Sequence, residues 1–137
     1  MREFVTTTKV LFTTVGGVIG SIFGEVDGFL YALLVLMVMD YLTGIMAAIL
    51  EKNLSSTVGM KGIFKKVMIL FLVALAHLID FHVMKQGGAV RTAVIFFYFS
   101  NEGLSILENA TRVGLPIPKR IRQLLAQLQE TDDKESQ

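Results

Sequence analysis

The sequence contains no cysteine and no tryptophan, and it has two prolines and two histidines among 137 residues. Without cysteine, a disulfide framework, a thiol nucleophile and a cysteine-ligated metal site are all excluded. The chain also lacks an excess of either charge, because thirteen basic residues stand against twelve acidic ones. Net charge therefore predicts neither nucleic-acid binding nor an acidic substrate.

Hydrophobic residues, by contrast, are abundant. They make up 53% of the chain, above the about 45–50% that is usual in soluble domains. The mean hydropathy is +0.59. We expect a small all-α integral membrane protein. A cleaved N-terminal signal peptide fits less well, because further hydrophobic segments follow.

Four segments are candidate membrane spans. Residues 28–50 are the clearest, with Asp40 as their single charge and a helical length of about 34 Å, enough to cross a hydrocarbon core of about 30 Å. Residues 67–84 predict a second span and residues 89–107 a third, less apolar one. Residues 4–24 are marginal, because a lysine, five threonines and four glycines interrupt them. The expected total is three to four spans.

Three glycines favour the N-terminal segment as a further span. Gly16, Gly20 and Gly24 stand four residues apart, a doubled G-x-x-x-G pattern that lets two helix backbones approach closely in a bilayer. A flexible, glycine-rich surface segment is the alternative.

After the last candidate span, Gly114, Pro116 and Pro118 end the helix and Lys119 begins another. Apolar and basic side chains alternate there with helical periodicity, which predicts a short amphipathic helix on the inner leaflet or against a second copy of itself. Its apolar positions are Ile121, Leu124, Leu125 and Leu128. The acidic tail, residues 130–137, is expected to be disordered. The chain thus divides into a transmembrane domain, residues 1–114, and a cytoplasmic part, residues 115–137.

The basic residues are unevenly distributed between the loops. With four spans, eleven lie on one side and two, Lys85 and Arg91, on the other, whereas three spans give nine and four. Because basic loops stay in the cytoplasm, four spans are preferred and both termini are predicted to be cytoplasmic. The expected location is the bacterial cytoplasmic membrane.

Asp40 lies near the centre of the clearest span, where an aspartate costs about 2.5–3.5 kcal/mol on insertion scales. It shares a helical face with Thr43 and Gly44, so we expect this face to contact another helix. One interpretation is a hydrogen-bonded lock between helices of one subunit.

Two further polar residues, His77 and Asp80, stand three apart and are predicted to hydrogen-bond to each other. We interpret them as structural, because no nucleophile accompanies them, and we expect no catalytic residues and no cofactor. His77 and His82 are five apart and miss the spacing that places two metal ligands on one helical face, so no metal site is expected.

The last candidate span carries a polar stripe at helical spacing, which must meet protein or water. It is formed by Tyr98, Asn101, Glu102, Ser105, Glu108 and Asn109. Two interpretations remain open. The stripe bonds to neighbouring helices, or it lines an aqueous opening once subunits assemble.

Residues 34–128 also contain an ordered set of short motifs. They are Asp40-Tyr41-Leu42-Thr43-Gly44, Ser55-Ser56, Gly59, Lys61-Gly62-Ile63, Lys65-Lys66, Asp80, Asn101-Glu102, Ser105-Ile106-Leu107-Glu108-Asn109, Gly114, Pro116 and Pro118. This set resembles the toxin-secretion and phage-lysis holins of Gram-positive bacteria and their phages. The resemblance does not cover the glycine-rich N-terminal segment.

The resemblance implies a protein that accumulates in the cytoplasmic membrane and then forms large homo-oligomers. These would release a muralytic enzyme (an endolysin) or a toxin and cause lysis. The expected partners are the lipid bilayer and other copies of the chain, with no stable contact to the exported protein. An ion channel or transporter subunit for small solutes is the alternative, because the same polar residues would suit a narrow path.

Overall fold

The computed structural model describes residues 1–85 and 87–135, in which loops join helices and there is no strand. This confirms the predicted all-α class. The helices are α1 (Arg2–Phe23), α2 (Gly28–Leu50), α3 (Ser56–Leu78), the π-helix η1 (Ile79–Met84), α4 (Ala89–Val113) and α5 (Lys119–Glu135).

Three of the described helical segments are long and apolar enough to cross a membrane, namely α1, α2 and the continuous Ser56–Met84 segment formed by α3 and η1. The N-terminal segment, marginal in sequence, is therefore among them. The last candidate span along the chain, residues 89–107 of α4, does not meet this criterion. It carries Arg91, Glu102, Glu108 and Arg112, so its average hydropathy is low.

The predicted span of residues 28–50 coincides with α2, whereas the helices around it extend beyond the predicted spans. The next helix begins at Ser56 rather than at residue 67, because the Ser55 hydroxyl caps it by accepting a hydrogen bond from the Val58 amide at 3.2 Å. Helix α4 continues past residue 107 to Val113 and ends at Gly114, whose φ of 102° suits glycine.

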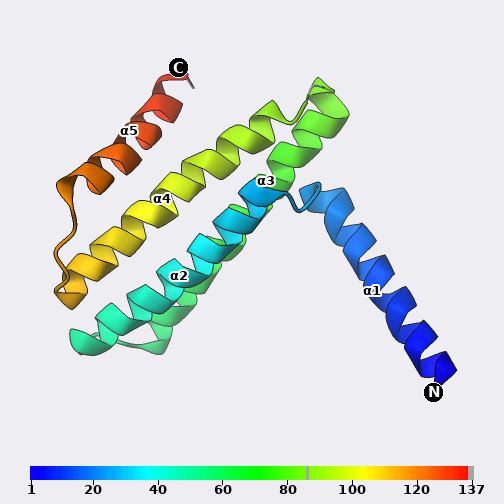
Figure 1. The fold of residues 1–137 in the computed structure, drawn as a ribbon, viewed down its shortest axis with the longest axis horizontal. Helices are drawn as coiled ribbons and strands as arrows, with labels where there is room; N and C mark the ends of the chain where they lie inside the picture. The colour runs from blue at the N-terminus through cyan, green and yellow to red at the C-terminus, as the bar shows by residue number, and fades with distance from the viewer. Residues whose placement is uncertain (86, 136–137) are drawn as a thin grey trace.

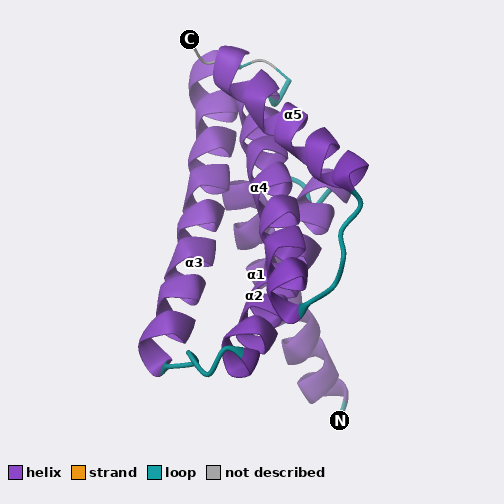
Figure 2. Ribbon diagram, turned by 90° about the vertical axis from the view of Figure 1, so that its left-hand side faces the viewer, coloured by secondary structure: helices purple, strands orange, loops and turns teal. Residues whose placement is uncertain are grey.

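The C-terminal amphipathic helix is longer than expected. It runs to Glu135, so the predicted disorder is wrong for residues 130–135, while residues 136–137 of the tail lie outside the described residues. Helix α5 turns back and lies alongside α4 (Figures 1 and 2). Arg122 donates to the Thr111 hydroxyl of α4 at 3.2 Å.

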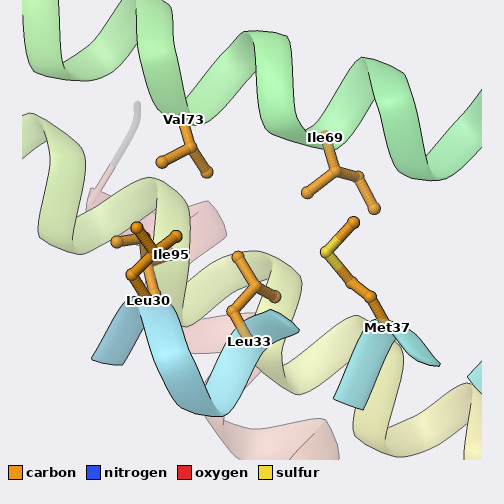
Figure 3. Close-up of a cluster of buried hydrophobic side chains, with 6 residues drawn as sticks. All are labelled: Leu30, Leu33, Met37, Ile69, Val73 and Ile95. Atoms are coloured by element: carbon orange, nitrogen blue, oxygen red, sulfur yellow. The ribbon is translucent and has the colours of Figure 1, made fainter. Parts of the chain in front are cut away.

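Helices α2, α3 and α4 form the body of the molecule (Figure 1). Their apolar side chains meet in one core, shown in Figure 3, which comprises Leu30, Leu33, Met37, Ile69, Val73 and Ile95. Helix α4 lies along α2 and therefore occupies the same depth in any membrane that α2 crosses.

Helix α1 points away from this bundle (Figure 1) and has no buried residue. Its end near Phe23 lies against the bundle, beside α3. Residues 24–27 and the glycines Gly87 and Gly88 thus lie at one end of the bundle, and residues 51–55 and the end of α4 lie at the other.

Candidate functional site

Three charged side chains from three helices meet inside the bundle. Lys66 of α3 lies between Asp40 of α2 and Glu102 of α4 and bonds to both carboxylates, with 2.5 Å between Lys66 Nζ and Asp40 Oδ2. The side chains are 16%, 14% and 8% exposed, respectively. We call Asp40, Lys66 and Glu102 the ion triad.

The ion triad joins segments that are distant in sequence. Taking a charge out of water is costly, and an opposite charge in good geometry offsets that cost. Because each of the three helices supplies one member, moving any one helix away would leave buried charges unpaired. The ion triad therefore specifies how α2, α3 and α4 pack.

Asn109 extends this network along α4. Its amide Nδ2 donates to Asp40 Oδ1 at 3.1 Å and to the Thr43 hydroxyl at 3.0 Å. A Cβ added at Gly44 would lie 3.6 Å from the same Asn109 nitrogen. The face of α2 around Asp40, predicted to contact another helix, is thus turned toward α4, and Gly44 leaves room for the Asn109 amide.

An exposed ion pair follows at the end of the bundle. Arg112 contacts Glu51 at 2.7 Å and also donates to the Asn109 side-chain oxygen at 3.2 Å. The hydrogen bond from Arg112 lowers the pKa of the Glu51 carboxyl from its usual value of 4.5. Exposed pairs of this kind contribute little to stability. The buried ion triad is therefore the main ionic interaction between α2, α3 and α4.

Tyr41 fits against two glycines of α3. A Cβ at Gly62 would lie 3.3 Å from the Tyr41 ring, and one at Gly59 would lie 3.5 Å from its hydroxyl. The two glycines therefore provide the surface on which the ring packs, next to the ion triad.

A cleft of about 1240 Å³ opens between α2, α3 and α4. The ion triad lies in it, together with Tyr98, Asn101, Ser105 and Asn109. Five of the six predicted stripe residues thus line one cleft.

The two interpretations of the stripe apply to different members of it. Glu102 and Asn109 are buried and bond to neighbouring helices of the same subunit. Tyr98, Asn101 and Ser105 are partly exposed along the cleft. Glu108 is exposed and does not line it.

The predicted span of residues 67–84 leaves Lys66 in the preceding loop, and this is wrong. It lies within α3 and is bound by two carboxylates. The sequence did contain a signal for this pairing. Asp40 inside a span needs a partner, and Lys66 directly precedes the apolar run of residues 67–84.

A second polar cluster joins α1 to the opposite end of the bundle. The buried Arg91 guanidinium donates to the carbonyls of Phe23 and Glu25, each at 2.8 Å, and contacts Asp27 at 2.9 Å. Partial burial opposes ionisation of Asp27, yet hydrogen bonds from the Leu30 amide and Arg91 keep its pKa below 3.8. This cluster anchors the turn before α2.

The predicted bond between His77 and Asp80 is replaced by a helix cap. Both Asp80 oxygens accept from backbone amides at the start of α4, from Val90 at 3.1 Å and Arg91 at 2.7 Å. Those amides have no partner within their own helix, which makes the aspartate a favourable cap. The His77 ring lies against Gly24 instead.

The three glycines of the N-terminal pattern do not share one helical face. Helix α1 ends at Phe23, and Gly24 adopts φ 78° in the turn, where an added Cβ would lie 2.8 Å from His77 Nδ1. Gly16 and Gly20 are helical, and nothing lies within 4 Å of a Cβ added at either. They leave an open, small-residue surface on α1.

Apolar helices around a buried charged cluster define a small multi-helix membrane protein. Residues 17–130 match the sequence profile of the bacteriophage holin family. The chain belongs to this family, and the resemblance seen in its motifs is confirmed.

Individual relatives agree with this assignment. A probable holin of Bacillus phage phi105 is 34% identical over 116 residues, which cover 85% of this chain and 84% of the relative. An uncharacterized protein of Listeria innocua is 46% identical over 110 residues, covering 80% and 78%. An uncharacterized 14.9 kDa protein of Clostridium perfringens is 38% identical over 128 residues, covering 93% and 97%. No solved structure matches the chain.

Proposed function

We propose that this holin assembles in the bacterial cytoplasmic membrane into homo-oligomers that open lesions, through which a muralytic enzyme or toxin leaves the cell. Membership of the holin family and the phage relative support a holin role. The observation that carries the assembly step is α1, which has no buried residue and is available to other copies.

The threonines of α1 are compatible with a membrane. Five of their hydroxyls donate to the backbone carbonyl four residues earlier, at 2.8 to 2.9 Å. They therefore need no partner from water. Lipid covers the apolar side chains, while Gly16 and Gly20 permit close approach of a second α1.

The cleft supplies polar groups for the wall of an opening. Tyr98, Asn101 and Ser105 line it beside the ion triad, so separating the helices would expose these groups to water. Under this proposal the chain performs no catalysis and needs no stable contact with the exported protein. The alternative of a channel for small solutes uses the same polar groups.

Coexpression with a cytoplasmic cell-wall hydrolase tests the proposal, with hydrolase alone as the control. Abrupt loss of turbidity and release of a cytoplasmic reporter protein are expected when both proteins are present. Ion leakage without release of the reporter would favour the small-solute channel. If cells show neither lysis nor ion leakage, both functions are contradicted.

The topology gives a separate prediction, since the chain has no native cysteine. Single cysteines replacing Glu3 and Ser55 should resist an impermeant thiol reagent in intact cells, whereas one replacing Glu25 should react, because basic loops stay inside. Labelling after permeabilisation is the control. Reaction at Glu3→Cys in intact cells would show that α1 does not cross.

Assembly through α1 predicts that Gly20→Leu shortens the ladder of crosslinked oligomers in membranes, since a bulky side chain separates the two backbones. Thr14→Leu is the matched control, because it adds bulk on a face of α1 that lies about a third of a turn away from Gly20. Equal ladders for wild type and Gly20→Leu would contradict a contact at this glycine.

A further inference from the structure

The cleft between α2, α3 and α4 is a candidate binding site in its own right. It extends from Ser56, at the start of α3, to Leu72, deeper in the bundle. Many of its lining side chains are apolar, among them Ile45, Ala48, Phe64, Met68 and Leu72. A cleft of this kind in a membrane bundle is suited to a hydrocarbon chain.

Two exposed positive charges lie at the mouth of the cleft. Lys61 and Lys65 stand four residues apart, so they share one face of α3, and both are exposed and line the cleft. Neither is ion-paired within the described part of the chain. Lys66 and Arg112 also line the cleft, but carboxylates neutralise them.

We infer that this cleft binds one anionic phospholipid, with its phosphate on Lys61 and Lys65 and an acyl chain along Phe64, Met68 and Leu72. Basic pockets between membrane helices at the cytoplasmic face suit anionic headgroups. The ion triad has one more carboxylate than it has ammonium groups, so an anionic headgroup is favoured at the mouth and not beside the triad.

A second copy of the chain is a poorer occupant. Helix α1 is the exposed apolar helix that another copy would offer, and its first half carries Arg2 and Lys9. Inserting that half would bring positive charge toward Lys61 and Lys65. Charge complementarity therefore favours the lipid, and this inference does not depend on the proposed lesion.

Native mass spectrometry of the purified full-length protein tests the inference. The protein is equilibrated in neutral detergent with equal amounts of phosphatidylglycerol and phosphatidylcholine, and the bound lipid is counted. Phosphatidylglycerol should be retained preferentially. The double variant Lys61→Gln/Lys65→Gln should bind it about 25-fold more weakly, since each basic side chain near an anionic surface contributes about fivefold.

The matched control is Lys52→Gln/Lys119→Gln, which removes two charges from positions that do not line the cleft and should retain the lipid. All four lysines are exposed, so the helical circular dichroism should not change. Three results would each overturn the inference. They are equal retention of both lipids by the wild type, unchanged binding of phosphatidylglycerol by Lys61→Gln/Lys65→Gln, and an equal loss of that binding in the control.

Two additional measurements identify other occupants. Millimolar inorganic phosphate should not displace the bound lipid, and displacement would mean that the mouth binds free phosphate. A cysteine replacing Ser105, which lines the cleft, should not crosslink to a second copy in phosphatidylcholine alone. Crosslinking there would assign the cleft to another subunit and contradict the lipid site.

Discussion

Lys66→Met is expected to lower the free energy of unfolding by about 3–5 kcal/mol, because removing one partner of a buried pair leaves the other charge uncompensated. Here two carboxylates, Asp40 and Glu102, depend on the same ammonium group. The variant should accumulate poorly in membranes, and what accumulates should unfold at a lower temperature.

The matched control is Lys119→Met, the same change at an exposed lysine that does not line the cleft. Thermal unfolding of both variants in one detergent, followed by helical circular dichroism, measures the difference. Lys119→Met should behave like wild type. If Lys66→Met also unfolds at the wild-type temperature, the ion triad does not hold the helices together.

A compensated variant separates loss of charge balance from loss of packing. Adding Asp40→Asn and Glu102→Gln to Lys66→Met removes the unpaired carboxylates, and buried ion pairs can often be replaced by neutral groups without loss of stability. Most of the lost stability should return. Failure to recover would mean that the lysine stem, and not its charge, is what the bundle requires.

The helical architecture could be predicted from the sequence, because uninterrupted apolar runs have few other stable forms in a bilayer. The bounds of α2, residues 28–50, follow from its composition and were predicted correctly. The early start of α3 was missed because its first turns are polar. Hydropathy does not detect a helix cap such as Ser55.

The ion triad could be predicted only in part. Asp40 and Glu102 were recognised as polar residues needing partners, yet which cation serves them depends on how three helices pack. Lys66 was counted as a loop charge for this reason. Similarly, Asp80 was paired with its near neighbour His77, whereas the fold brings it to the start of α4.

Several motifs of the holin resemblance lie far apart in sequence and meet around one cleft. Asp40 and Tyr41 come from α2, Gly62 from α3, and Glu102 and Asn109 from α4. Their contacts give a physical reason for the residue types. Two carboxylates pair with one lysine, and a glycine leaves space for a tyrosine ring. These motif residues thus belong to one packing arrangement.

Glu102 is a member of the ion triad whose removal leaves a charge-balanced pair. Glu102→Leu leaves the Lys66–Asp40 pair intact and electrically balanced, so the subunit should still fold, insert and accumulate. The proposed lesion, however, exposes the cleft to water, and there the additional carboxylate would gain hydration. Leucine removes that gain, so release of a coexpressed hydrolase should be strongly delayed or abolished.

Glu102→Gln should have a milder effect, because an amide still hydrogen-bonds and tolerates water. Glu108→Leu is the matched control, since it makes the same change on α4 at an exposed residue that does not line the cleft, and its lysis time should stay near that of wild type. Culture turbidity is followed at equal membrane levels of each variant. Lysis of Glu102→Leu cells on the wild-type schedule would mean that Glu102 serves packing within the subunit and has no part in the opening.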